Sequence, residues 1–126
     1  MVRFQNGPLV LIDPWWRDLF AGDRWGKLLG EFPLEPEQQP EPDLVLCTHW
    51  HDDHICPVSI PRLATHFPAL KFVVPNRSVD LLTDWGIPRD RIVPMMGSDS
   101  TIIDGIQIHA IPAAHEELDI TEDGAW

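Results

Sequence analysis

Thr48-His49-Trp50-His51-Asp52-Asp53-His54 is the stretch on which the fold and the chemistry of this chain depend. It places three of the six histidines of a 126-residue sequence within six consecutive positions, beside two aspartates. Repulsion between imidazolium ions disfavours such a cluster unless it binds something. Neutral imidazole nitrogens and carboxylate oxygens are the ligands that zinc, iron and manganese accept. The stretch therefore predicts a site for a divalent metal ion.

The residues before this cluster predict how its side chains are presented. Residues 43–47, Asp-Leu-Val-Leu-Cys, contain an apolar run typical of a short buried strand. Because strand side chains alternate, an extended chain continuing one step further would direct His49 and His51 to the same side. Asp53 and His54 follow a turn, so they would reach a second position nearby. The spacing predicts two ligands for one ion and the beginning of a second site.

The pattern His-x-His-x-Asp-His at residues 49–54 resembles the signature of the metallo-β-lactamase-fold hydrolases. Leu11-Ile12-Asp13-Pro14 resembles the strand end that precedes this signature, and residues 112–119 resemble the next ligand motif. The sequence is similar to the branch that includes L-ascorbate-6-phosphate lactonases. The resemblance implies an α/β fold, namely the first half of an αββα sandwich, with a mixed sheet and helices on one face.

The resemblance also implies a set of metal ligands: His49, His51, Asp53, His54 and His115. The first two histidines and His115 would hold one ion and leave a position for water, as catalytic metal sites do. Asp53 and His54 would begin a second site. Asp53 would also be catalytic, since it would orient the nucleophile or accept its proton. We expect one or two divalent ions, zinc first, with manganese or iron as the other candidates.

The domain implied by this resemblance is longer than the present sequence. Its second half normally supplies an aspartate that bridges both ions and a last histidine, and residues 120–126 contain no histidine. We therefore expect residues 1–126 to be a single, incomplete domain in which only the first metal site can form in full. Weak or no activity is expected for the chain alone. We also expect it to self-associate or to be complemented by a C-terminal half.

Composition restricts the partners. A formal net charge of −11 disfavours non-specific binding to nucleic acid or to a membrane surface. It does not exclude a small anionic substrate, because bound metal ions invert the local field. No apolar run is long enough for a membrane span. Residues 1–8 lack the apolar region of a secretory signal, and Cys47 and Cys56 are interpreted as reduced thiols, so we expect a cytoplasmic protein.

Other interpretations of the cluster remain open. A closed structural zinc site would use Cys47, Cys56 and two histidines, although such sites favour cysteines two residues apart. For the protein as a whole, the first hypothesis is activated-water attack on a lactone or a phosphate ester. The alternatives are a non-catalytic metal-binding module that docks on a partner chain and a nuclease of the same superfamily. The acidic balance counts against the nuclease.

The rest of the sequence predicts alternating strands and helices, which is typical of α/β layering. Strands are predicted at residues 9–12, 70–74 and 92–93, a hairpin at 101–111 with Asp104-Gly105 as its turn, and helices at 18–29, 57–67 and 76–85. Asn76 is predicted to cap the last helix, and the acidic residues of 31–43 are expected to be solvated. His66 and His109 are interpreted as structural. Trp15 and Trp16 read as pocket-lining or core residues.

Overall fold

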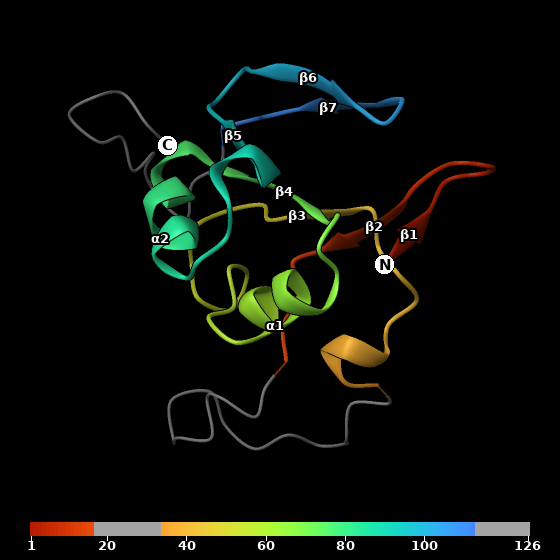
Figure 1. The fold of residues 1–126 in the computed structure, drawn as a ribbon. Helices are drawn as coiled ribbons and strands as arrows, with labels where there is room; N and C mark the ends of the chain where they lie inside the picture. The colour runs from red at the N-terminus through yellow and green to blue at the C-terminus, as the bar shows by residue number, and fades with distance from the viewer. Residues whose placement is uncertain (17–33, 113–126) are drawn as a thin grey trace.

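The computed structural model describes residues 1–16 and 34–112 (Figure 1). The strands are β1 (Val2–Arg3), β2 (Leu9–Ile12), β3 (Leu44–Leu46), β4 (Lys71–Pro75), β5 (Ile92–Met95), β6 (Ser100–Ile103) and β7 (Ile106–His109). The helices are α1 (Ser59–His66) and α2 (Val79–Asp84), with short 3-10 helices η2 (Pro36–Gln38), η3 (Asn76–Ser78) and η4 (Arg89–Arg91). Within these two stretches, no helix has the length and apolar character needed to cross a membrane. The predicted helix at residues 18–29 lies outside the described residues.

Five strands form one mixed sheet in the order β1-β2-β3-β4-β5. Strands β2 to β5 run parallel, and the two-residue strand β1 pairs antiparallel with β2 at the edge. Parallel neighbours end at the same edge of a sheet, so the chain leaves β2, β3 and β4 at adjacent points. The predicted α/β class and the mixed sheet are confirmed. Residues 48–54 follow β3 at this edge.

Helices α1 and α2 cover one face of the sheet (Figure 1). Val45 and Phe72 are fully buried on that face, where they pack with Ile60 and Leu63 of α1 and Leu82 of α2. The spacing in residues 57–67 had predicted Ile60, Leu63, Ala64 and Phe67 as the buried face, and all four are buried. Burial of this amphipathic stripe stabilises the helix, which is too short to be stable alone.

The hairpin β6–β7 covers the opposite face of the sheet (Figure 1). Its Ile103 and Ile108 pack with Val10, Leu44 and Val73. Positive φ angles of 49° at Asp104 and 82° at Gly105 fit the two-residue turn predicted there. On the outer side, His109 Nδ1 lies 2.5 Å from Ser100 Oγ across the two strands. The predictions of a hairpin and of a structural His109 on its polar face are confirmed.

Arg91 closes the C-terminal end of α1. Its guanidinium donates hydrogen bonds to the carbonyl oxygens of Ala64 (3.1 Å), Phe67 (2.8 Å) and Leu70 (2.8 Å). Helix ends leave backbone carbonyls without intrahelical donors, and a cation near them also suits the helix dipole. Desolvation lowers the pKa of Arg91 from its usual value. One side chain from the end of η4 thus fixes the connection between α1 and β4.

Two local predictions were wrong. Asn76 does not cap α2; it begins η3, and the helix starts only at Val79 because the chain first makes a tighter turn. The acidic segment is not simply solvated: Pro36 is buried in η2, and Glu37 and Glu35 bind Arg62 of α1 at 2.6 and 2.9 Å. Local composition does not predict an ion pair between residues that lie so far apart in the sequence.

Candidate metal centre

The histidine cluster occupies a bent loop and not an extension of β3. The strand ends at Leu46, and residues 48–51 form bends. A tight turn follows, in which the backbone N–H groups of His54 and Ile55 donate to the His51 carbonyl oxygen at 2.9 and 2.7 Å. Ile55 and Cys56 are then buried and anchor the far end of the loop in the core. The turn brings His54 back toward the residues that directly follow the strand.

Asp13, which directly follows the neighbouring strand β2, holds this loop in place. Its carboxylate accepts hydrogen bonds from the Thr48 backbone N–H at 2.7 Å and from the Thr48 hydroxyl at 2.8 Å. The same carboxylate lies 2.9 Å from His54 Nδ1. Asp13 has a positive φ of 44°, a conformation that aspartate tolerates better than most residues. These contacts make Asp13 a supporting residue of the cluster.

His49 contacts both of the other clustered histidines. His49 Nε2 lies 3.1 Å from His51 Nδ1, and the rings of His49 and His54 have centroids 3.8 Å apart. Thr48 Oγ1 lies 3.2 Å from His49 Nδ1 and 3.4 Å from His54 Nδ1. Asp53 completes the group, since its carboxylate lies 3.5 Å from His54 Nε2. Four of the five predicted ligands are therefore brought together.

The donor set fits a divalent metal ion. One potential ligand atom from each of His49, Asp53 and His54 lies within 4.8 Å of the others. In a tetrahedral zinc site with Zn–N bonds of about 2.0–2.1 Å, two ligand nitrogens lie roughly 3.3 Å apart. The 3.1 Å separation between His49 and His51 is close to that value. The sequence predicted that His49 and His51 bind one ion and that Asp53 and His54 begin a second site. In the structure, His49 lies close to His51 and also to Asp53 and His54.

Electrostatics keep His49 in the state that binds metal. Partial burial lowers the pKa of His49 below its usual value, and the neighbouring His54 and His51 lower it further. The carboxylates of Asp13 and Asp53 act in the opposite direction but are the smaller influence. Metals bind the neutral imidazole, and a bound proton must be displaced first. The lowered pKa favours the neutral form of His49, which is the form that binds metal.

The structural zinc alternative is not supported by the geometry. Cys47 and Cys56 are buried free thiols, and neither belongs to the ligand group formed by the described residues. Desolvation raises the pKa of the Cys47 thiol well above its usual value, and Asp13 adds to this effect. Cys56 Sγ instead faces the Trp16 carbonyl oxygen at 3.9 Å. These thiols serve as core side chains, in agreement with the predicted reduced state.

The remaining histidines are accounted for separately. His115 lies outside the described residues, so its role as a ligand stays a prediction. His66 is exposed in the last turn of α1, and its ring contacts Phe67. Asp52 lies outside the described ligand group. Thr48, which directly precedes the signature, was not predicted to support the cluster.

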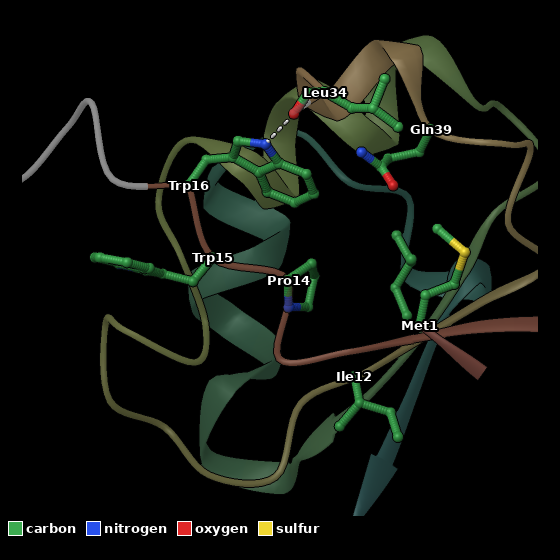
Figure 2. A pocket seen from close by; sticks show the side chains of 8 residues that line it. Met1, Ile12, Pro14, Trp15, Trp16, Leu34 and Gln39 are labelled. Carbon is green, nitrogen blue, oxygen red and sulfur yellow. Dashed lines mark hydrogen bonds between the residues drawn. The ribbon is translucent and has the colours of Figure 1, made fainter. Parts of the chain in front are cut away.

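An apolar pocket of about 270 Å³ adjoins the loop that follows Asp13 (Figure 2). Trp15 and Trp16 both contribute to its lining, as one of their two sequence interpretations had it. Trp16 Nε1 donates to the Leu34 carbonyl oxygen at 2.7 Å, which holds the indole over the pocket mouth (Figure 2). None of the predicted metal ligands lines this pocket.

Residues 9–125 match the sequence model of a family described as "Beta-lactamase superfamily domain". Among curated proteins, the chain is similar to those named "Probable L-ascorbate-6-phosphate lactonase UlaG" of Salmonella paratyphi B, Salmonella newport and Salmonella heidelberg. In each case 34% of 83 aligned residues are identical, and these cover 65% of this chain and 23% of the relative. The match thus spans less than a quarter of the length of these relatives.

Proposed function

Because this chain belongs to the beta-lactamase superfamily, we propose that it forms the metal-binding part of a metal-dependent hydrolase. The observation that carries the proposal is the cluster of His49, His51, Asp53 and His54, held in place by Asp13. Three imidazoles and the Asp53 carboxylate converge there from one loop. The carboxylate of Asp13 lies beside them, in contact with His54. Such donor sets recur in catalytic metal sites.

His49 and His51 would hold the first ion together with His115, and Asp53 and His54 would begin a second site. Asp13 binds His54 Nδ1 and so fixes which ring nitrogen faces the site. When bound, a divalent ion supplies Lewis acidity, which makes water nucleophilic near neutral pH and offsets negative charge on a reacting oxygen. Asp53, on the rim of the cluster, would orient the attacking water or accept its proton.

The substrate we propose is a small anionic lactone or a phosphate ester. The support is the similarity to proteins named as probable L-ascorbate-6-phosphate lactonases, which extends over 65% of this chain. We propose zinc as the first candidate ion, with manganese or iron as alternatives, since the donor set accepts all three. The two buried free thiols favour a reducing compartment, and we therefore propose the cytoplasm.

Metal uptake tests the first part of the proposal. The purified chain is expected to bind at least one zinc ion in a titration against a chromophoric chelator. His51→Ala should weaken zinc binding by about tenfold or more, because a first ligand and a contact of His49 are lost together. His109→Ala is the matched control, since this histidine lies on the hairpin and should leave zinc affinity unchanged. Equal zinc affinity in both variants would refute the metal site.

Turnover tests the second part. A panel of sugar-derived lactones and phosphate esters, offered to the metal-loaded chain together with the C-terminal portion of a relative, should give metal-dependent hydrolysis that His51→Ala and Asp53→Asn abolish. If the chain binds zinc tightly but turns over nothing, alone or with the C-terminal portion of a relative, it is a metal-binding module that docks on a partner. Cleavage of RNA at low salt would instead favour the nuclease alternative.

A further inference from the structure

A cation from the next loop lies against the histidine cluster. Arg77 belongs to η3, directly after β4, and its guanidinium carbon lies 4.5 Å from the centroid of the Trp50 ring. Trp50 stands between His49 and His51 in the sequence, and its ring meets the His51 ring edge-on with centroids 4.5 Å apart. Two ring contacts therefore connect Arg77 to the metal ligands.

The topology explains why these groups meet. Strands β3 and β4 are parallel neighbours, so the loop that carries Trp50 and the turn that carries Arg77 leave the same edge of the sheet. In open α/β sheets, ligands bind at this carboxyl edge. At this edge, the guanidinium of Arg77 contacts an aromatic face of the candidate site.

Stacking also orients the donors of this side chain. A guanidinium that lies over an indole keeps its N–H groups in its own plane, where planar pairs with phosphate or carboxylate oxygens form. Trp50 is 42% exposed, so the platform itself lies at the surface of the site. In a chain with a formal net charge of −11, Arg77 supplies a positive charge beside the candidate site.

We propose that Arg77, positioned by Trp50, is a specificity-determining residue that binds an oxyanion group of the substrate, either a phosphate or a carboxylate. This inference rests on the proposed hydrolase function and adds a second recognition point to it. The reacting bond would lie at the histidine cluster, and a separate anionic group of the same molecule would lie at Arg77. The competing explanation is that Arg77 only covers Trp50.

Anion binding to the whole chain tests this inference directly. Inorganic phosphate and acetate would be titrated calorimetrically into the zinc-loaded and the metal-free protein. Arg77→Gln should weaken the binding of the recognised anion by about tenfold or more, since a charge-assisted hydrogen bond is lost. Arg77→Lys, which keeps the charge but not the planar fork, should fall between Arg77→Gln and the unmodified chain. A larger loss for phosphate than for acetate identifies a phosphate, and the reverse identifies a carboxylate.

The control is Arg3→Gln, which removes the same charge from the edge strand β1. If Arg77→Gln and Arg3→Gln bind both anions equally well, or if the unmodified chain binds neither anion, the inference is overturned. Arg77→Met, which retains the stem over Trp50, replaces Arg77→Gln if the latter melts early. If the chain takes up no zinc, the proposed metal-dependent function is refuted, but the inference about Arg77 is not. The anion titration of the metal-free protein then decides the role of Arg77.

Discussion

Asp13 shows at the scale of single residues how the candidate metal centre is held. Its carboxylate accepts two hydrogen bonds from Thr48 and contacts His54 Nδ1, so one side chain fixes both ends of the ligand loop. Replacing a group that orients a metal ligand typically weakens the affinity for the metal by about 10- to 100-fold. The support comes from a different strand, 35 residues earlier in the chain than Thr48.

We predict that Asp13→Asn weakens zinc affinity by about 10- to 100-fold without removing a ligand. The amide is similar in size to the carboxylate, but its NH₂ group cannot accept the hydrogen bonds that Thr48 donates. Competition with a chromophoric chelator would measure the dissociation constant. Asp80→Asn, on the exposed side of α2, makes the same chemical change away from the site. An affinity for Asp13→Asn that matches this control would contradict the prediction.

The sequence predicted that the histidine side chains of the loop cluster, because they are neighbours in the chain. Histidines two and three residues apart remain close together in a bend as they do in a strand, so His49, His51 and His54 meet although the expected strand extension does not form. The Asp13–Thr48 contact and the stacking of Arg77 on Trp50 depend on strand order instead. Periodicity within one segment does not determine which strands lie side by side.

At the scale of elements, helix α1 depends on two arginine contacts. Arg91 closes its C-terminal end, and Arg62 ties its first half to η2 through Glu35 and Glu37. A buried hydroxyl adds a third connection, since Ser59 Oγ donates to the Pro14 carbonyl oxygen. This last bond joins the start of α1 to the segment that follows Asp13. The helix is thus fixed at both ends by residues distant in sequence.

We predict that Arg91→Met lowers the free energy of unfolding by about 2 kcal/mol or more, because three carbonyl oxygens lose their donors together. The methionine stem retains much of the contact with Phe72, over which the guanidinium carbon lies at 5.5 Å. Urea denaturation followed by circular dichroism would measure the change. Arg91→Lys keeps the charge and a single donor group, and it should lose less. Identical denaturation midpoints for Arg91→Met and the unmodified chain would refute this role.

The Glu37–Arg62 pair predicts a pH dependence. The hydrogen bond from Arg62 is the main cause that lowers the pKa of Glu37 below its usual value. A carboxyl with a lowered pKa in the folded chain stabilises the fold fully above its unfolded pKa, near 4.5, and loses this effect as pH falls through the folded value. Both side chains are partly exposed, so the gain is about 0.5–1 kcal/mol at most.

Glu37→Gln should therefore lower stability at pH 7 and make little difference at pH 3. Urea denaturation at the two values would show whether the gap between the variant and the unmodified chain closes on acidification. Glu41→Gln makes the same charge change outside this pair and should give no pH-dependent gap of comparable size. A gap that stays constant between pH 7 and pH 3 would show that the pair contributes nothing through titration.

At the scale of the whole molecule, the predicted layers are confirmed for the described residues. Helices lie on one face of a mixed sheet and a hairpin on the other. Hydrophobic periodicity sufficed for this, since the strands that lie within the sheet are continuous apolar runs. Strand β1 was not predicted, because two exposed residues carry no such pattern. That residues 1–126 form a single domain stays a prediction.

Exposed apolar side chains on the hairpin give the expectation of self-association a specific location. Ile102 in β6 is 71% exposed, and Ile111, which follows β7, is 82% exposed. We propose that this surface pairs with a second copy of the chain. Ile102→Thr keeps the β-branched shape while removing apolar surface, so it should weaken concentration-dependent association in sedimentation velocity. Gln107→Thr, at the paired position on β7, is the control. A monomer at all concentrations would refute the proposal.

The placement of Arg91 also has a consequence for synthesis on the ribosome. The carbonyl that it binds at Ala64 is made 27 residues earlier, which at about 5–20 residues per second is an interval of roughly one to five seconds. During that time the nascent helix α1 emerges without the side chain that completes it. Slow codons between the two positions would lengthen this exposure, and fast ones would shorten it.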